Sequence, residues 1–188
     1  MPAQRRQRAD EIPASVGFAP ISAASARILI LGSLPGQMSL QRGEYYAQPH
    51  NAFWRIMGAL FDAGPNLPYA ERKRRLIAQD VAVWDVCASA RRAGSLDASI
   101  ASTSVVPNDF VGFYAAHPRI ESIGLNGAAA AVLYERLVER TLAQPLTRMR
   151  RVRLPSTSPA HASMSFDQKL AAWSEFRQLA MAGRTVAA

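Results

Sequence analysis

The chain has 188 residues and a formal net charge of +8, and 49% of its residues are hydrophobic. This length allows one well-packed domain rather than two, and the composition excludes an intrinsically disordered chain. Nearly all of the positive charge comes from Arg, because Lys occurs only at Lys73 and Lys169. Since Arg pairs with phosphate through two hydrogen bonds, the charge favours a polyanionic partner, although coding bias also explains an Arg-rich chain.

The single cysteine, Cys87, excludes an internal disulfide, a Cys-ligated iron–sulfur cluster and a zinc ribbon. It stands in an apolar run, so we expect a small core thiol rather than a nucleophile. No apolar run approaches the length of a membrane span, and the Arg-rich start lacks the apolar segment of a secretory signal. We therefore expect a soluble, cytoplasmic protein without membrane contact.

The pattern of apolar residues predicts an alternation of strands and helices. Residues 1–25 form a basic arm and an extended surface lead-in, and residues 26–184 form one domain. The predicted strands are 27–31, 81–86, 119–125 and 149–154, and the predicted helices are 51–61, 70–79, 108–116, 128–142 and 165–181. Such an alternation predicts an α/β fold, a three-layer α/β/α sandwich with a central four-stranded parallel sheet.

Polar or aromatic segments follow all four predicted strands. They are residues 32–51, 85–97, 126–127 and 156–161. In a parallel sheet the carboxyl ends of the strands lie at one edge, where open α/β sheets bind their ligands. We therefore expect these four segments to form one site.

Several common active sites are not supported by the sequence. It contains neither a phosphate-binding G-x-x-x-x-G-K-[ST] loop nor a dinucleotide-binding G-x-G-x-x-G loop. The run GSLPG at residues 32–36 is not the nucleophile elbow of hydrolases, because its serine stands one position early. The three histidines are scattered and show no metal-ligand spacing.

The motifs GSLPG, YYAQPHNAFW, WDVCASARRAGSLDASI, NDF, GLNG and LPSTSPAHA, in this order, resemble the uracil-DNA glycosylase superfamily. Within it the chain is most similar to the hypoxanthine-DNA (deoxyinosine) glycosylase branch, over residues 28–173. The resemblance implies a monofunctional enzyme that extrudes a deaminated base from DNA, hydrolyses its N-glycosidic bond and leaves an abasic site. It implies no metal and no cofactor, and we expect a monomer whose partner is the damaged DNA.

The sequence departs from the mismatch-specific uracil enzymes, whose first loop reads G-I-N-P-G and positions a water with its Asn. That position is Leu34 here, and Leu154 replaces the usual Asn or His before Pro-Ser. Both changes count against efficient uracil chemistry. In the hypoxanthine branch the Asn of the x-P-x-N-x-F-W segment carries catalysis, and it corresponds to Asn51.

The resemblance then gives a set of candidate site residues. Asn51 is the catalytic candidate, with an N-cap of the following helix as the alternative. The base-binding candidates are Gly32, Ser33 and Leu34 as pocket wall, Tyr46 and Phe53 for stacking, and Asp85 and Asn126 for the base edge. The DNA-binding candidates are Ser156, Thr157, Ser158 and His161, although His161 stands where the branch has Asn. Each candidate also has a structural alternative. Tyr46 and Phe53 could be core aromatics, Asp85 a helix cap and Asn126 a turn residue, and Ser156, Thr157 and Ser158 could form an ordinary polar loop.

Two other functions remain open from the sequence. One is a uracil or thymine mismatch glycosylase with a rearranged water site. The other is a non-catalytic DNA-binding relative, since Leu34 removes a polar group.

Overall fold

The fold is described from a computed structural model that covers residues 12–142 and 149–182. Nearly all of the predicted basic arm, and the end of the predicted domain, lie outside these described residues.

A four-stranded parallel sheet forms the centre of the fold, with the strand order β3-β2-β6-β7. Its strands are β2 (Ile28–Gly32), β3 (Val81–Asp85), β6 (Ser122–Asn126) and β7 (Arg150–Leu154). Every residue of the first three strands is buried, as expected of apolar runs covered by helices on both faces. The predicted α/β/α sandwich with its parallel sheet is confirmed.

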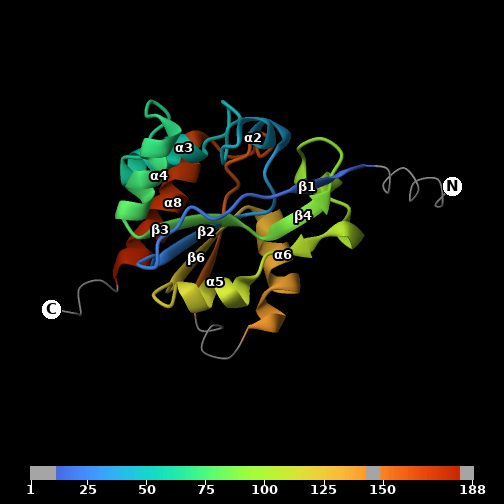
Figure 1. Ribbon diagram of the computed structural model, residues 1–188. Coiled ribbons are helices and arrows are strands. Elements are labelled where there is room, and N and C mark those ends of the chain that lie inside the picture. The colour runs from blue at the N-terminus through green and yellow to red at the C-terminus, as the bar shows by residue number, and fades with distance from the viewer. Residues whose placement is uncertain (1–11, 143–148, 183–188) are drawn as a thin grey trace.

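Helices cover both faces of this sheet (Figure 1). On one face lie α3 (Phe53–Phe61), α4 (Tyr69–Ala78) and α8 (Phe166–Met181), and on the other lie α5 (Phe110–Ala116) and α6 (Ala128–Leu137). The rings of Phe53 and Trp173 meet edge to face between α3 and α8. On the opposite face the hydroxyls of Tyr114 and Tyr134 share a 2.8 Å hydrogen bond between α5 and α6. Each layer therefore has its own aromatic contact.

A second, antiparallel sheet was not predicted. It has the order β1-β4-β5 and consists of β1 (Ala14–Val16), β4 (Cys87–Arg91) and β5 (Val106–Pro107). The lead-in is therefore part of the fold, and Ile21, which pairs with Val83, is only 5% exposed. The predicted boundary at residue 26 divides residues that pack together. Cys87 is a buried free thiol, as predicted.

Short helices complete the described part of the chain. They are α2 (Gln37–Arg42) and the 3-10 helices Asp97–Ser99, Ser102–Ser104 and Glu139–Thr141. The helix predicted for residues 128–142 thus ends at Leu137, and its remainder includes a 3-10 turn. Two other helices begin with side-chain caps: Asp109 accepts from the Gly112 N–H, and Ser165 forms a capping box with Gln168.

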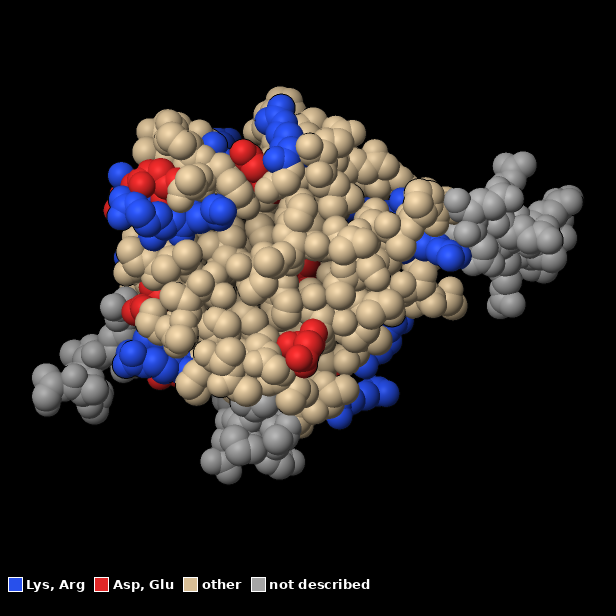
Figure 2. Space-filling view, in the orientation of Figure 1, with Lys and Arg blue, Asp and Glu red and all other residues tan. Residues whose placement is uncertain are grey.

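The charged surface is unevenly distributed. On the face shown in Figure 2, Lys and Arg side chains stand mainly at the margins, and the central surface is largely uncharged, with acidic atoms visible in a recess. Among the described helices, none is long and apolar enough to cross a membrane.

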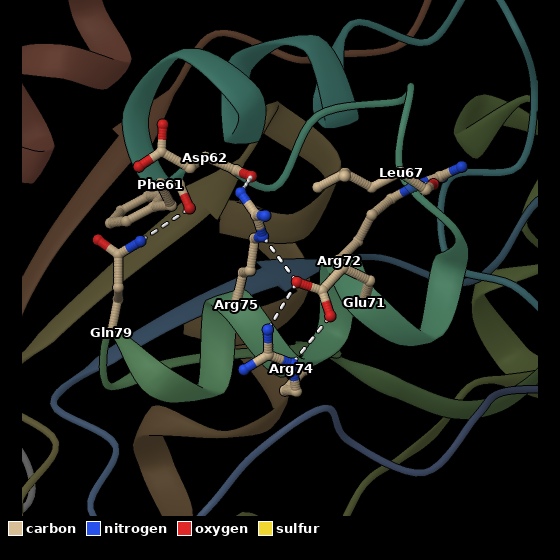
Figure 3. A network of polar contacts seen from close by, with 8 residues as sticks. All are labelled: Phe61, Asp62, Leu67, Glu71, Arg72, Arg74, Arg75 and Gln79. Carbon is tan, nitrogen blue, oxygen red and sulfur yellow. Dashed lines mark hydrogen bonds and ion pairs between the residues drawn. The ribbon is translucent and has the colours of Figure 1, made fainter.

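The basic helix α4 is tied to the end of α3 by side-chain contacts to main-chain oxygens (Figure 3). Arg75 donates to the Asp62 carbonyl at 2.8 Å, and Gln79 donates to the Phe61 carbonyl at 2.7 Å. Glu71 accepts from Arg75 on the same helix at 2.8 Å. These contacts satisfy carbonyls at the C-terminus of α3, so this Arg cluster serves the fold.

Candidate active site

The carboxyl ends of the parallel strands bring polar residues into one row. Gly32 pairs with Asp85 across β2 and β3, and Asn126 pairs with Leu154 across β6 and β7. Since Leu31 pairs with Leu125, Gly32 and Asn126 stand at the same level of the sheet. A cavity of about 500 Å³ opens above this row, within the range of small-molecule sites.

The predicted site residues converge on this cavity with one exception. Those that line it are Gly32, Ser33, Leu34, Tyr46, Asn51, Asp85, Asn126, Ser156, Thr157, Ser158 and His161. Phe53 does not line the cavity, because it is fully buried behind Tyr46. The predicted residues therefore gather at one cavity, and the structure distinguishes the residues of its wall from those that support the wall.

Asn126 is a structural node between three segments. Its Nδ2 donates to the Tyr46 hydroxyl at 3.2 Å and to Thr157 Oγ1 at 3.0 Å, and its Oδ1 accepts from the Thr157 N–H at 2.9 Å. Both amide protons are thus used inside the protein. We expected Asn126 to read the base edge directly. The geometry instead favours a positioning role for this residue.

Tyr46 has a strained backbone at the cavity wall. Its φ of +54° lies in the left-handed region, which bulky residues rarely adopt. The ring is held against Phe53, with centroids 3.8 Å apart and planes 18° apart. Burial raises the pKa of Tyr46, so its hydroxyl stays protonated and keeps a proton to donate. Gly32 leaves the room for this arrangement, because a Cβ there would clash with the Tyr46 hydroxyl and the Asp85 carboxylate.

Asn51 contacts the start of α3 and also lines the cavity. Its Oδ1 accepts from the N–H of Phe53, the first residue of α3, at 3.0 Å, although the N-cap position itself is Ala52. Within the described part of the chain no hydrogen bond occupies its Nδ2. The bond to Phe53 thus holds Asn51 in place while its amide protons remain available for a ligand.

Asp85 is a buried carboxyl group at the cavity floor. The residue is 3% exposed, and its Oδ2 is buried without a hydrogen-bond partner among the described residues. Burial, reinforced by the nearby negative charge of Asp97, raises the pKa of Asp85 to about 7, and Arg92 opposes this shift. The group is therefore largely neutral in mildly acidic solution and can donate a proton in a hydrogen bond.

Arg92 and Asp97 were missed as site residues, and together they join two loops. The Arg92 side chain is 1% exposed and donates to the carbonyls of Leu34, Pro35 and Gly94. Asp97 lines the cavity, accepts from the Ser33 hydroxyl at 2.5 Å and lies 3.8 Å from Arg92 Nη1. The motif GSLDASI, which contains Asp97, was among those that resemble the superfamily. Arg92 lies just before this motif in an irregular polar segment, and that pattern gave no reason to place its side chain in the interior.

The loop from Pro155 to His161 is anchored by α8. Trp173 Nε1 donates to the Pro155 carbonyl at 3.1 Å, and Lys169 Nζ donates to the His161 carbonyl at 2.8 Å. Thr157 is 1% exposed, and its N–H, hydroxyl and carbonyl all bond within the protein. Thr157 thus holds the loop, which leaves Ser156, Ser158 and His161 as candidate DNA contacts.

A family model of the uracil DNA glycosylase superfamily matches residues 19–177. The chain belongs to this superfamily.

Two similar proteins come from Methanosarcina, and both are named hypoxanthine DNA glycosylase. The protein of Methanosarcina acetivorans is 34% identical over 115 residues, or 61% of this chain and 72% of the relative. That of Methanosarcina barkeri is 32% identical over 112 residues, or 59% and 70%. A solution NMR structure from Methanosarcina acetivorans, described as a candidate uracil DNA glycosylase, matches with a TM-score of 0.72 and 30% identity. The match covers 89% of this chain and 99% of that one.

This glycosylase-family site has no evident metal centre in residues 12–142 and 149–182. No group of three or more His, Cys, Asp or Glu side chains there could hold a metal ion.

The raised pKa of Asp85 predicts a pH-dependent stability. Between the unfolded value of 3.8 and the folded value of about 7, only the folded protein holds the proton. This contribution to stability is therefore complete below about pH 4 and is lost as the pH rises to about 7. We expect Asp85→Asn to raise the Tm by roughly 5 °C at pH 8 and by much less at pH 4.5. Thermal unfolding at both pH values checks this, with exposed Glu135→Gln as control, and an equal change at both would contradict it.

The buried Arg92 predicts a large loss of stability on its removal. Arg92→Met leaves the buried carbonyls of Leu34 and Pro35, and the carbonyl of the exposed Gly94, without their donor, so we expect a loss of about 2–4 kcal/mol in the free energy of unfolding. Urea denaturation measures this difference. Arg74→Met is the matched control, because Arg74 pairs with Glu71 on the surface and should leave the midpoint nearly unchanged. Similar midpoints for the two variants would show that Arg92 does not hold the loops.

Proposed function

We propose that this protein is a monofunctional DNA glycosylase that hydrolyses the N-glycosidic bond of hypoxanthine in DNA and leaves an abasic site. The observation that carries the proposal is the cavity, which is lined both by Asn51, whose amide protons have no acceptor among the described residues, and by the aromatic ring of Tyr46. The names of the two Methanosarcina relatives support the same substrate. The net charge of +8 suits a DNA partner.

Recognition begins when the base leaves the stack and enters the cavity. Tyr46 lines the cavity and is backed by Phe53, so it offers a firm aromatic surface on which the base can stack. At the floor, neutral Asp85 can donate one hydrogen bond and accept another. In hypoxanthine the N1–H is the matching donor and the O6 carbonyl is the matching acceptor, because deamination replaces an amino group with a carbonyl.

Catalysis then requires stabilisation of a negative charge on the departing base. The sugar becomes oxocarbenium-like as the bond lengthens, water adds to its anomeric carbon, and the proton that the water loses neutralises the anionic base. The Asn51 Nδ2 protons can donate to the departing base and to the attacking water, as preorganised donors do. Asp85 must be neutral at this stage, because an ionised carboxylate beside an anionic base would oppose its departure. Leu34 stands where the mismatch-specific uracil enzymes have their water-positioning Asn, so the first loop offers no polar side chain at that position.

Asn51 provides the direct mutational test. Asn51→Ala removes both the Oδ1 acceptor of the Phe53 N–H and the amide protons, whereas Asn51→Ser keeps an acceptor there and removes only the amide protons. We expect both variants to lose about 100-fold or more in the single-turnover rate on a hypoxanthine-containing duplex. The assay is alkaline cleavage at the abasic product, with a uracil duplex alongside. Full activity in Asn51→Ser would show that Asn51 only holds the start of α3.

The assay also separates the alternative functions. Faster cleavage of the uracil duplex would favour a mismatch-type uracil glycosylase, and binding without cleavage of either duplex would favour a non-catalytic relative. We further propose that a cytoplasmic monomer with a single glycosylase domain does this work. Size-exclusion chromatography with light scattering gives its oligomeric state.

A further inference from the structure

The cavity is lined by acidic residues, although the protein as a whole is basic. The formal net charge of the chain is +8, yet within the described residues no Lys or Arg lines the cavity. Its two acidic residues are Asp85 and Asp97, and acidic atoms are visible in the recess of Figure 2. Since carboxylates repel the phosphates of DNA, binding of the DNA backbone does not explain them. A carboxylate in this cavity suits a positively charged group.

The two acids lie at different depths. The residue Asp85 is 3% exposed, whereas the side chain of Asp97 is 40% exposed. A base that enters the cavity occupies its deep part, and the sugar to which the base is attached stays nearer the mouth. Asp85 is therefore placed to contact the base, and Asp97 is placed to face the sugar.

The carboxylate of Asp97 is held in a fixed position. Its Oδ1 accepts from the Ser33 hydroxyl at 2.5 Å and lies 3.8 Å from Arg92 Nη1. The main-chain carbonyl of Asp97 accepts from the Ile100 N–H at 3.1 Å. Across the described ranges 12–142 and 149–182, no hydrogen bond occupies its Oδ2. One carboxylate oxygen is thus anchored by the protein, and the other is available to a ligand.

We propose that the Asp97 carboxylate faces the sugar of the extruded nucleotide and stabilises the positive charge that develops there. The inference rests on the proposed function and adds a residue to it. As the N-glycosidic bond breaks, its electron pair leaves with the base and the sugar becomes an oxocarbenium-like cation. Asp97 forms no bond to this cation. Its fixed negative charge lowers the energy of the cation, water then adds to the anomeric carbon, and the proton that the water loses passes to the base.

The kinetic test replaces Asp97 by its uncharged isostere. We expect Asp97→Asn to lower the single-turnover rate on a hypoxanthine-containing duplex by about 30-fold or more, because the sugar cation then lacks an opposing charge. Glu135→Gln is the matched control, since it removes the same charge from an exposed position on α6 outside the cavity. This control should keep the wild-type rate. An unchanged rate in Asp97→Asn would overturn the proposal.

A binding measurement separates the charge of Asp97 from its contacts to Ser33 and Arg92. The probes are two duplexes with an abasic analogue: a pyrrolidine, whose positively charged ring nitrogen replaces the anomeric carbon, and an uncharged tetrahydrofuran. We expect the wild-type protein to bind the pyrrolidine duplex at least about tenfold more tightly than the tetrahydrofuran duplex. Asp97→Asn should reduce this preference to less than about threefold, whereas a purely structural loss would weaken both complexes equally. Fluorescence anisotropy at constant salt measures both affinities.

The wild-type protein alone also tests the proposal. If it cleaved the hypoxanthine duplex but did not prefer the pyrrolidine duplex, the proposal would be overturned, whether or not Asp97→Asn folds. A full preference that persisted in Asp97→Asn would overturn it too and would leave Asp97 a structural residue. If the wild-type protein cleaved no hypoxanthine duplex, the proposed function itself would fail and this inference with it.

Discussion

The side-chain amide of Asn126 holds the cavity together. It stands at the end of β6 and bonds at once to Tyr46, which follows β2, and to Thr157, which follows β7. Thr157 in turn accepts from the Ala52 N–H at 2.9 Å, at the start of α3. Three loops that are far apart in the sequence are thereby fixed to one another. The left-handed backbone of Tyr46 persists because these contacts and the stack on Phe53 outweigh its strain.

Three ionisable side chains, those of Asp85, Arg92 and Asp97, set the electrostatics of the same cavity. Two carboxylates, Asp85 and Asp97, face the cavity near the buried guanidinium of Arg92, whose own pKa is lowered by burial. Arg92 pairs with Asp97 and with main-chain carbonyls, while the Oδ2 of Asp85 has no hydrogen-bond partner within residues 12–142 and 149–182. The two acids thereby have different roles: Asp97 fixes a loop through Ser33 and Arg92, whereas Asp85 holds a proton near neutral pH. Such a division suits a site that must accept a base and then tolerate its negative charge.

The sequence predicted the parallel sheet because its strands are apolar runs that are buried on both faces. It predicted the cavity because the motifs follow these strands and the carboxyl ends of parallel strands meet. The antiparallel sheet escaped prediction, since β1 and β5 are very short and β4, CASAR, has no bulky apolar residue. The interior position of Arg92 also escaped it, because the carbonyls that Arg92 binds belong to a loop 58 residues earlier. The local pattern of apolar and polar residues does not reveal polar contacts between residues that are so far apart in the sequence.

The claim that the cavity releases an intact base is tested most directly by analysing the products. Purified protein is incubated with a hypoxanthine-containing duplex, and the free bases are quantified by liquid chromatography with mass spectrometry. We expect one free hypoxanthine for each abasic site, with the DNA backbone intact until alkali is added. Strand breaks at the lesion without free hypoxanthine, or no product at all, would contradict the proposed glycosylase chemistry.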